Sequence, residues 1–306
     1  MPQDEFKSDT VKSRGPRSVG PWFWCAMIAA VVGVTWLYAG VFRWLLHMWG
    51  SNDDYSHGYF VPLFSAYVLW SNREKLHLRN PSPTLASDLA VGITLLLAGL
   101  ALRVAGIYLR VLTFEALSLI PFLVGAVVIL TGRELLRWFV PAALFLVFMI
   151  PLPQFLSGQM SGLLQTLATG VSTFALQTLG VPAVAEGNII SLSTGTIGVA
   201  EACSGLRMLY AFFALTLGAC LVIDRSLIEK VFIAASAVPI AIAANCIRIV
   251  ATGLAYEYFD PHTAEYIFHD VAGWLMMPLG FLILMLGLSV LDRMLVIEDA
   301  PLTARA

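Results

Sequence analysis

Long apolar segments follow one another along almost the whole chain, separated by short polar stretches. A transmembrane helix needs about 20 mostly apolar residues to cross the hydrocarbon core of a membrane. The pattern predicts an all-α polytopic membrane protein of about eight transmembrane helices. The predicted spans are residues 21–46, 58–72, 86–105, 112–131, 136–151, 205–223, 230–256 and 268–291. The second and fifth are short, so we expect them to be tilted or joined to interfacial turns.

The composition agrees with this pattern. The 306 residues are 58% hydrophobic and 12% charged, whereas soluble domains are about 45–50% apolar and about 25% charged. We therefore expect one membrane-embedded domain over residues 21–292, between a polar cytoplasmic tail at 1–20 and a second cytoplasmic tail at 293–306. The first apolar segment is too long for a signal-peptide core and lacks a clear cleavage site, so we expect it to be retained. No nucleic-acid motif is present.

Lysine and arginine gather on the cytoplasmic side of membrane proteins, so their distribution predicts the orientation. With the amino terminus inside and eight spans, 13 of the 18 basic residues lie on the cytoplasmic side. These are Lys7, Lys12, Arg14, Arg17, Arg73, Lys75, Arg79, Arg133, Arg137, Arg225, Lys230, Arg293 and Arg305. The outer side receives Arg43, Arg103, Arg110, Arg207 and Arg248. This asymmetry predicts that both termini are cytoplasmic.

In this orientation the longest loop, residues 152–204, lies outside. It begins after Pro151-Leu152-Pro153, where two prolines end the preceding helix. Residues 158–180 have apolar positions at helical spacing broken by Ser, Thr and Gln, which predicts an interfacial (amphipathic) or re-entrant helix. Residues 183–199 are rich in β-branched residues and contain turn signals, which predicts a short extracytoplasmic β-hairpin.

Cys203 follows this hairpin, where the sixth helix should begin. A helix amino terminus favours the thiolate, which is the nucleophilic form of cysteine. Ser204 could leave room for a substrate backbone, and Arg207 lies four residues on, on the same helix face, where it adds positive potential. A lone cysteine in a membrane helix is usually a small inert hydrophobe. We assign that role to Cys25, Cys220 and Cys246.

Two further polar groups lie at the outer ends of other predicted helices. Arg248 belongs to the seventh helix, with Asn245 one turn earlier on the same face. An arginine in a span normally faces a cavity or a partner. Arg248 either holds a carbonyl oxyanion or a substrate carboxylate, or is a structural residue that snorkels or is ion-paired. His269, at the start of the eighth helix, is either a base for a thiol or a satisfied interfacial histidine. Together, Cys203, Arg248 and His269 match the nucleophile, electrostatic stabiliser and base of a cysteine acyl-transfer enzyme.

Three segments that contain these residues resemble the signature segments of the exosortase/archaeosortase family. They are residues 200–207 (AEACSGLR), 245–248 (NCIR) and 269–273 (HDVAG). Residues 54–58 (DYSHG), followed by Val61-Pro62-Leu63, resemble an early outer-loop segment of the same family. The number and order of the predicted helices over residues 21–292 are similar too.

The resemblance implies a bacterial inner-membrane enzyme whose active site faces the periplasm or exterior. Such enzymes are thought to process exported proteins that end in a Pro-Glu-Pro (PEP-CTERM) sorting tag, a single transmembrane helix and a basic tail. It implies a cysteine endopeptidase or transpeptidase in which Cys203 is the nucleophile, Arg248 the second catalytic residue and His269 the third. The expected partners are these exported proteins and membrane lipids, and no cofactor is expected.

Two further residues are predicted to support the site. His57 and Asp54, on the same outer face, could bind polar residues of the tag or orient loops.

A transporter or channel for lipid-linked saccharides is the alternative function, although the sequence shows no internal repeat and few intramembrane acids. A metal site built from His47, His57, His262 and His269 lacks any supporting His-x-x-Glu-His or Cys-x-x-Cys spacing.

Overall fold

The computed structural model describes residues 21–73, 86–199, 205–259 and 272–294. The chain divides into two compact units. The first comprises Met1–Phe42 and Leu69–Leu144, and the second comprises Arg43–Val68 and Phe145–Ala306.

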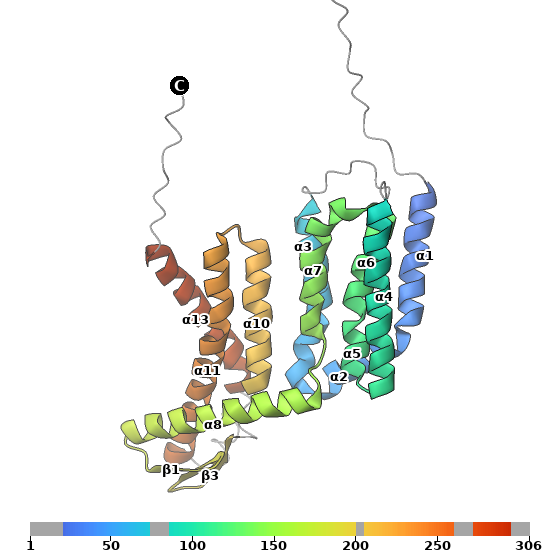
Figure 1. The fold of residues 1–306 in the computed structure, drawn as a ribbon. Helices are drawn as coiled ribbons and strands as arrows, with labels where there is room; N and C mark the ends of the chain where they lie inside the picture. Colours follow the sequence, from blue (N-terminus) through green and yellow to red (C-terminus); the bar gives the residue numbers. More distant parts are fainter. Residues whose placement is uncertain (1–20, 74–85, 200–204, 260–271, 295–306) are drawn as a thin grey trace, which may run out of the picture. The chain divides into compact units, whose positions relative to one another are not determined.

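The first unit is helical throughout its described part. It contains α1 (Pro21–Leu37), the start of α2 (Ala39–Ser51), the end of α3 (Phe60–Ser71), α4 (Ala86–Leu109), α5 (Leu112–Leu117), α6 (Leu119–Thr131), the 3-10 helix η3 (Arg133–Leu135) and α7 (Leu136–Phe145). Helices α4 and α6 lie side by side and form the most extensive contact of the unit (Figure 1).

Glycines allow α4 and α6 to approach this closely. Gly92 and Gly99 lie seven residues apart on one face of α4. A Cβ atom on Gly125 of α6 would lie 2.8 Å from the carbonyl oxygen of Gly92. A Cβ atom on Gly99 would lie 3.1 Å from the carbonyl oxygen of Ser118. In a membrane, where lipid is as apolar as leucine, such close backbone packing is a main source of helix association.

The structure corrects the first predicted span, because residues 21–46 do not form one helix. Residues 31–37 and helix α2 make an angle of 68° at a break that falls on Tyr38. Tyr38 is fully buried, and its hydroxyl lies 2.9 Å from the hydroxyl of Ser118. Arg103 stacks over the Tyr38 ring and donates a hydrogen bond to the carbonyl oxygen of Leu37. The bend therefore exposes a helix-end carbonyl that a long-range partner satisfies.

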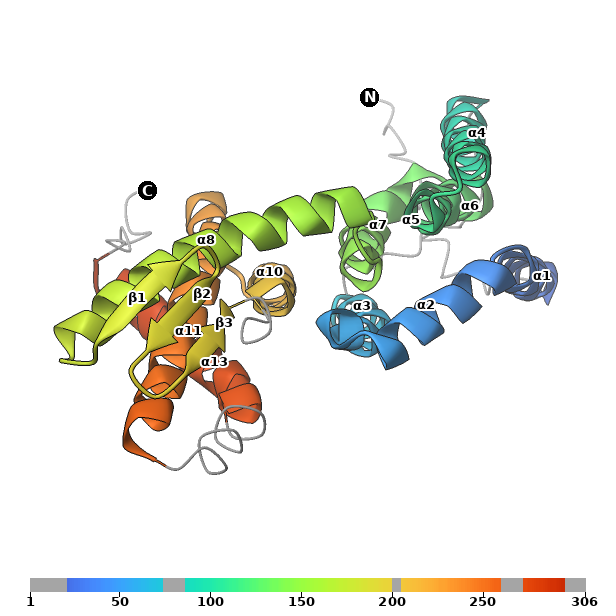
Figure 2. The same cartoon turned by 90° about the horizontal axis from the view of Figure 1, so that it is seen from below.

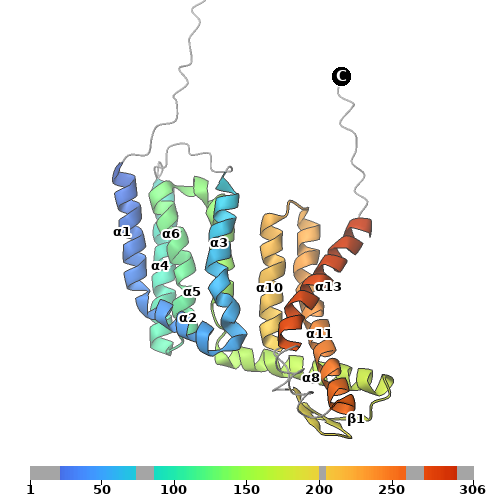
Figure 3. The ribbon, with the colours of Figure 1, turned by 180° about the vertical axis from the view of Figure 1, so that it is seen from behind.

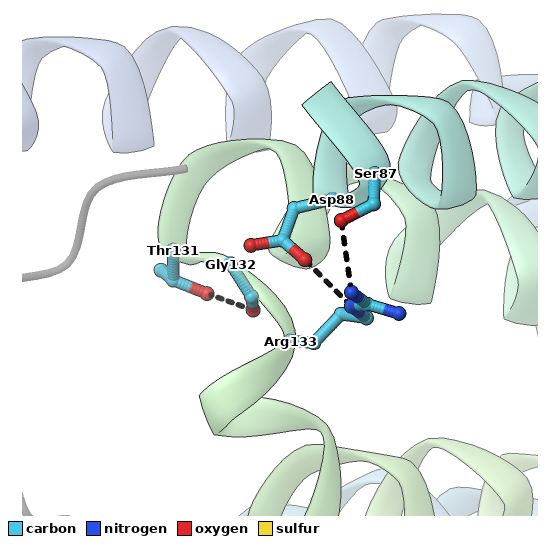
Figure 4. A network of polar contacts seen from close by, with 5 residues as sticks. All are labelled: Ser87, Asp88, Thr131, Gly132 and Arg133. Carbon is cyan, nitrogen blue, oxygen red and sulfur yellow. Dashed lines mark hydrogen bonds and ion pairs between the residues drawn. The ribbon is translucent and has the colours of Figure 1, made fainter. Parts of the chain in front are cut away.

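An ion pair ties the first turn of α4 to the start of η3, which follows α6. Arg133 Nε donates to Asp88 Oδ1 at 2.6 Å, and its second guanidinium nitrogen donates to the Ser87 hydroxyl at 3.0 Å (Figure 4). Gly132 precedes Arg133 with φ of 80°, a backbone conformation that glycine adopts without steric cost. The turn after α6 thus places the arginine beside the buried Asp88 carboxylate.

The second unit holds most of α3 and the rest of α2 together with later elements. In chain order these are the 3-10 helices η1 (Asp53–Tyr59) and η4 (Leu146–Met149), then α8 (Gln154–Thr178), β1 (Ala183–Glu186), β2 (Ile189–Leu192), β3 (Thr196–Gly198), α10 (Gly205–Val222), α11 (Leu227–Tyr258) and α13 (Ala272–Met294). Helices α10 and α11 form an antiparallel pair, α13 crosses them obliquely, and α8 crosses one end of the pair (Figures 1 and 3).

The predicted helix and hairpin of the long loop are both present. The helix forms as α8, which starts directly after Pro153. The hairpin joins β1 to β2 through Gly187 and Asn188, and Gly187 has φ of 63°. A third antiparallel strand, β3, extends the hairpin to a three-stranded sheet in the order β1-β2-β3. The interfacial position of α8 stays a prediction.

The sheet packs on α8 and α11 through one apolar cluster (Figure 2). Ile190 and Ile197 face each other across β2 and β3, and both are buried against Leu176 of α8 and Ile249 of α11. A second cluster joins α10, α11 and α13 through residues such as Phe212 and Leu284. The unit therefore has one core beneath the sheet and another within the helical pair.

Four helices of the described part are long and apolar enough to cross a membrane, or up to six if each bent pair forms one span. The four are α4, the combined segment 112–131, α10 and α11. Helix α3, in the second predicted span, has 12 residues, and α13 covers part of the eighth. The predicted count of eight spans is not confirmed, whereas a mostly helical chain with several membrane-spanning helices is.

Replacing Gly125 by leucine tests the close contact of α4 and α6. The added side chain meets the α4 backbone, so we expect the free energy of unfolding in detergent to fall by about 1–3 kcal/mol. Gly33 of α1 is the matched control, because a Cβ atom there meets nothing within 4 Å. Equal destabilisation by Gly125→Leu and Gly33→Leu, measured by thermal unfolding, would contradict this packing.

Candidate active site

The 3-10 helix η1 presents several polar side chains of the second unit. Asn52 caps it by accepting a hydrogen bond from the Asp54 amide at 3.0 Å. Asp53 and Asp54 lie in its first turn, where acidic groups are favoured by the helix dipole. His57 follows one turn later. This short helix therefore carries two carboxylates and an imidazole within one segment.

Arg207 links η1 to the first turn of α10. One guanidinium nitrogen lies 3.1 Å from Asp53 Oδ2, and Nε lies 3.6 Å from Asp54 Oδ1. The Arg207 side chain is 34% exposed and that of Asp53 is 82% exposed. Ion pairs exposed to this degree contribute at most about 1 kcal/mol each. Their main effect is to position η1 against the start of α10.

His57 is held between η4 and α10. Its Nε2 donates to the carbonyl oxygen of Phe148 at 3.1 Å, and its ring stacks on Tyr210 with 5.9 Å between centroids. Burial lowers the pKa of His57 below its ordinary value, and this effect outweighs the Phe148 hydrogen bond and the Asp54 carboxylate, which act in the opposite direction. The imidazole is therefore neutral at physiological pH.

Contacts of Trp49 and Gly58 also hold η1 in place. The Trp49 indole donates to the carbonyl oxygen of Met149 at 2.8 Å. A Cβ atom on Gly58 would overlap the Trp49 ring, so a glycine is needed for this contact. Tyr55 is buried nearby, and desolvation together with the Asp54 charge raises its pKa. These contacts give η1 one defined position beside η4.

Asn245 and Arg248 lie one turn apart on the buried side of α11. They are 3% and 8% exposed. Helix α8 packs against α11 and buries Thr169, Ser172 and Thr173, and the Ser172 hydroxyl lies 3.5 Å from the carbonyl oxygen of Cys246. An arginine in a membrane span costs at least about 2.5–3.5 kcal/mol unless polar groups surround it. The polar side of α8 supplies hydroxyl groups to this part of the unit.

The structure brings together Arg207, Asp54 and His57, and the predicted roles of the last two, in binding the tag or orienting loops, stay predictions. Asn245 and Arg248 share one side of α11, as their spacing predicts. Cys203, Ser204 and His269 lie outside the described residues. Within the described part, no group of three or more His, Cys, Asp or Glu side chains could hold a metal ion.

The sequence analysis did not single out Tyr210, which lies beside His57 in the candidate site. It stacks on His57 and meets Tyr55 edge to face at 5.9 Å between centroids. Its place three residues after Arg207 puts both side chains on one face of α10, and this spacing was the available signal. Without knowledge of where η1 packs, a tyrosine in an apolar helix carries no specific meaning.

The pKa of His57 predicts a pH dependence of stability. Because its folded pKa lies below the ordinary value of about 6.5, the unfolded chain binds the proton more readily as the pH falls. The stability that the neutral ring contributes is therefore present above about pH 6.5 and is lost below it.

The variant His57→Gln tests this pH dependence, because glutamine keeps a donor for Phe148 but does not titrate. In this variant we expect the midpoint temperature of unfolding to depend less on pH between about 7 and 5. His47→Gln removes an exposed imidazole and serves as the control; a wild-type pH dependence in His57→Gln would contradict the prediction.

Comparison with known proteins adds one finding. Residues 49–286 match the family model described as transmembrane exosortase. This range contains η1, the sheet, α10, α11 and most of α13. No curated protein and no solved structure matches the chain. The match covers well over half of the sequence and includes every segment that carries the candidate site. The chain therefore belongs to the transmembrane exosortase family, a family of membrane sorting proteases and transpeptidases.

Proposed function

We propose that this protein is a cysteine endopeptidase or transpeptidase that cleaves the carboxyl-terminal Pro-Glu-Pro sorting signal of exported proteins. The observation that carries the proposal is the burial of Arg248 in the membrane-spanning helix α11. Arg248 lies within the family-matched range that also contains Cys203 and His269. A buried guanidinium can stabilise an oxyanion, because it donates charge-assisted hydrogen bonds in a place shielded from water.

The topology of α10 and α11 supports this grouping. The two helices are antiparallel and joined by the short turn at 223–226. Ser226 and Glu229 form a capping box that fixes the start of α11. Gly205 and Asn245 lie about equally far along the chain from this turn, so they come at a similar level of the helical pair. Cys203 precedes Gly205 by two residues, and Arg248 follows Asn245 by three.

The proposed reaction proceeds through a thioester. The Cys203 thiol gives its proton to His269, and the sulfur attacks the carbonyl carbon of the scissile peptide bond. Arg248 donates hydrogen bonds to the oxyanion of the tetrahedral intermediate. When the C–N bond breaks, His269 returns the proton to the leaving amine. Water then releases the acid, or the amine of an acceptor forms a new amide bond.

The remaining residues are assigned supporting roles. Arg207, paired with Asp53 and Asp54, positions η1, and His57 fixes the same segment through Phe148. Ser204 leaves room for the substrate backbone, and Asn245 lies beside Arg248 on α11. We assign all of these groups to the outer side of eight spans in a bacterial inner membrane, with both termini cytoplasmic.

Replacing Cys203 by alanine tests the nucleophile. Because no other group forms the thioester, we expect processing of a co-expressed tagged substrate to fall by at least about a thousand-fold. Cys220→Ala, which removes a buried thiol of α10, is the matched control and should process normally. Continued cleavage in Cys203→Ala would exclude this mechanism.

Replacing Arg248 by lysine tests the oxyanion role. Lysine keeps the charge but lacks the planar fork of two parallel donors. We expect the rate of processing to fall by about a hundred-fold to a thousand-fold, the usual cost of losing an oxyanion donor. Arg137→Lys, at an exposed position, controls for the change of side chain. Wild-type rates in both variants would show that Arg248 is structural.

A further inference from the structure

An apolar groove runs along one side of the second unit, between α3 and α10. Its volume is about 530 Å³. Helix α3 contributes Phe60, Phe64 and Tyr67 to its lining, and α10 contributes Ala211, Ala214 and Gly218. His57 is the one titratable imidazole or acid along it in the described chain, and it lies at the end where η1 meets α3.

The α10 wall of the groove is built from small side chains. Ala211, Ala214 and Gly218 recur at helical spacing, so they share one face of the helix. A Cβ atom on Gly218 would lie 3.1 Å from the ring of Phe64, so the floor of the groove is closed by an aromatic ring in close contact. Small residues on one face are what allow another helix backbone to approach closely in a membrane.

The rim of the groove is apolar and exposed. Phe60 is 71% exposed, Tyr67 46% and Val222 42%. From Ala211 to Val222 the groove follows α10 for roughly 17 Å at 1.5 Å per residue. This is more than half of the hydrocarbon thickness of about 30 Å. An occupant must therefore be apolar over several helical turns.

The two ends of the groove differ in their polar groups. One end reaches His57 of η1, the short helix whose Asp53 and Asp54 pair with Arg207 of α10. The other end reaches Ile223, and the exposed Asp224 follows directly. The neighbouring Arg225 is paired with Glu229 at 3.3 Å. Membrane helices carry lysine and arginine at their cytoplasmic ends. A carboxylate at one end of the groove complements such a basic flank, whereas it would repel the phosphate of a lipid headgroup.

We propose that this groove docks a transmembrane helix of the protein substrate, with the basic flank of that helix beside Asp224 and its outer end beside His57. The inference rests on the proposed function, which supplies a substrate anchored in the membrane. It adds the surface that holds the anchor. A helix seated along α10 delivers the peptide that precedes it to the amino-terminal end of α10, where Arg207 lies.

Photo-cross-linking tests the docking without any chemistry. A photoreactive amino acid replaces Ala214 in the Cys203→Ala protein, and the probe is a carrier protein with a Pro-Glu-Pro tag, a transmembrane helix and an arginine tail. We expect at least a tenfold higher yield of enzyme–probe adduct from position 214 than from Leu97, an exposed apolar residue of α4 in the first unit. Equal yields, or adducts of position 214 with lipid alone, would overturn the proposal.

Filling the groove separates docking from catalysis. In Ala214→Trp we expect cleavage of the anchored probe to fall at least tenfold relative to Leu97→Trp, while cleavage of a tag peptide without the helix stays unchanged. An equal loss for both probes, or no loss for the anchored one, would contradict a docking role. If Cys203→Ala still cleaves, the proposed function fails, yet the cross-linking yields decide the groove independently.

Discussion

Arg248 keeps its charge at every physiological pH, yet it is 8% exposed within a helix that is apolar enough to cross a membrane. A guanidinium in hydrocarbon must be surrounded by polar groups or water. Several elements of the second unit pack against α11, the helix that carries this arginine. Helix α8 crosses the helical pair with buried hydroxyl groups, the sheet closes over α8 and α11, and Asn245 lies one turn from the arginine.

The second unit also contains a polar region around η1, and ion pairs and hydrogen bonds hold this region in place. Arg207 joins η1 to α10, and Phe148 and Met149 of η4 accept hydrogen bonds from His57 and Trp49. These contacts place His57 at the end of an apolar groove and Asp53 and Asp54 beyond it. Polar chemistry at one end and an apolar channel along the helices suit a substrate that is partly peptide and partly membrane anchor.

Local patterns predicted much of this fold. The helical spacing at 158–180, the turn signals at 183–199 and the apolar segments that became α4, α6, α10 and α11 are all present. The break at Tyr38 could not be predicted, because it depends on Arg103 and Ser118, which lie far along the chain.

In the candidate site, too, local patterns predicted some features, whereas others depend on tertiary packing. The position of Arg248 one turn after Asn245 follows from helix periodicity alone. The partners of Arg207 depend on where η1 packs, which no local pattern encodes, and for this reason Tyr210 was missed too. The groove between α3 and α10 is likewise a product of tertiary packing. Cys203, Ser204 and His269 lie outside the described residues, so their roles rest on sequence and family.

The most direct measurement of the thiol mechanism is mass spectrometry of the enzyme after brief incubation with a tagged substrate. We expect an adduct of the upstream substrate fragment on the peptide that contains Cys203, and we expect hydroxylamine to release it, because hydroxylamine cleaves thioesters. Absence of any adduct during active cleavage, an adduct on another cysteine, or a stable disulfide between Cys203 and Cys246 would contradict it.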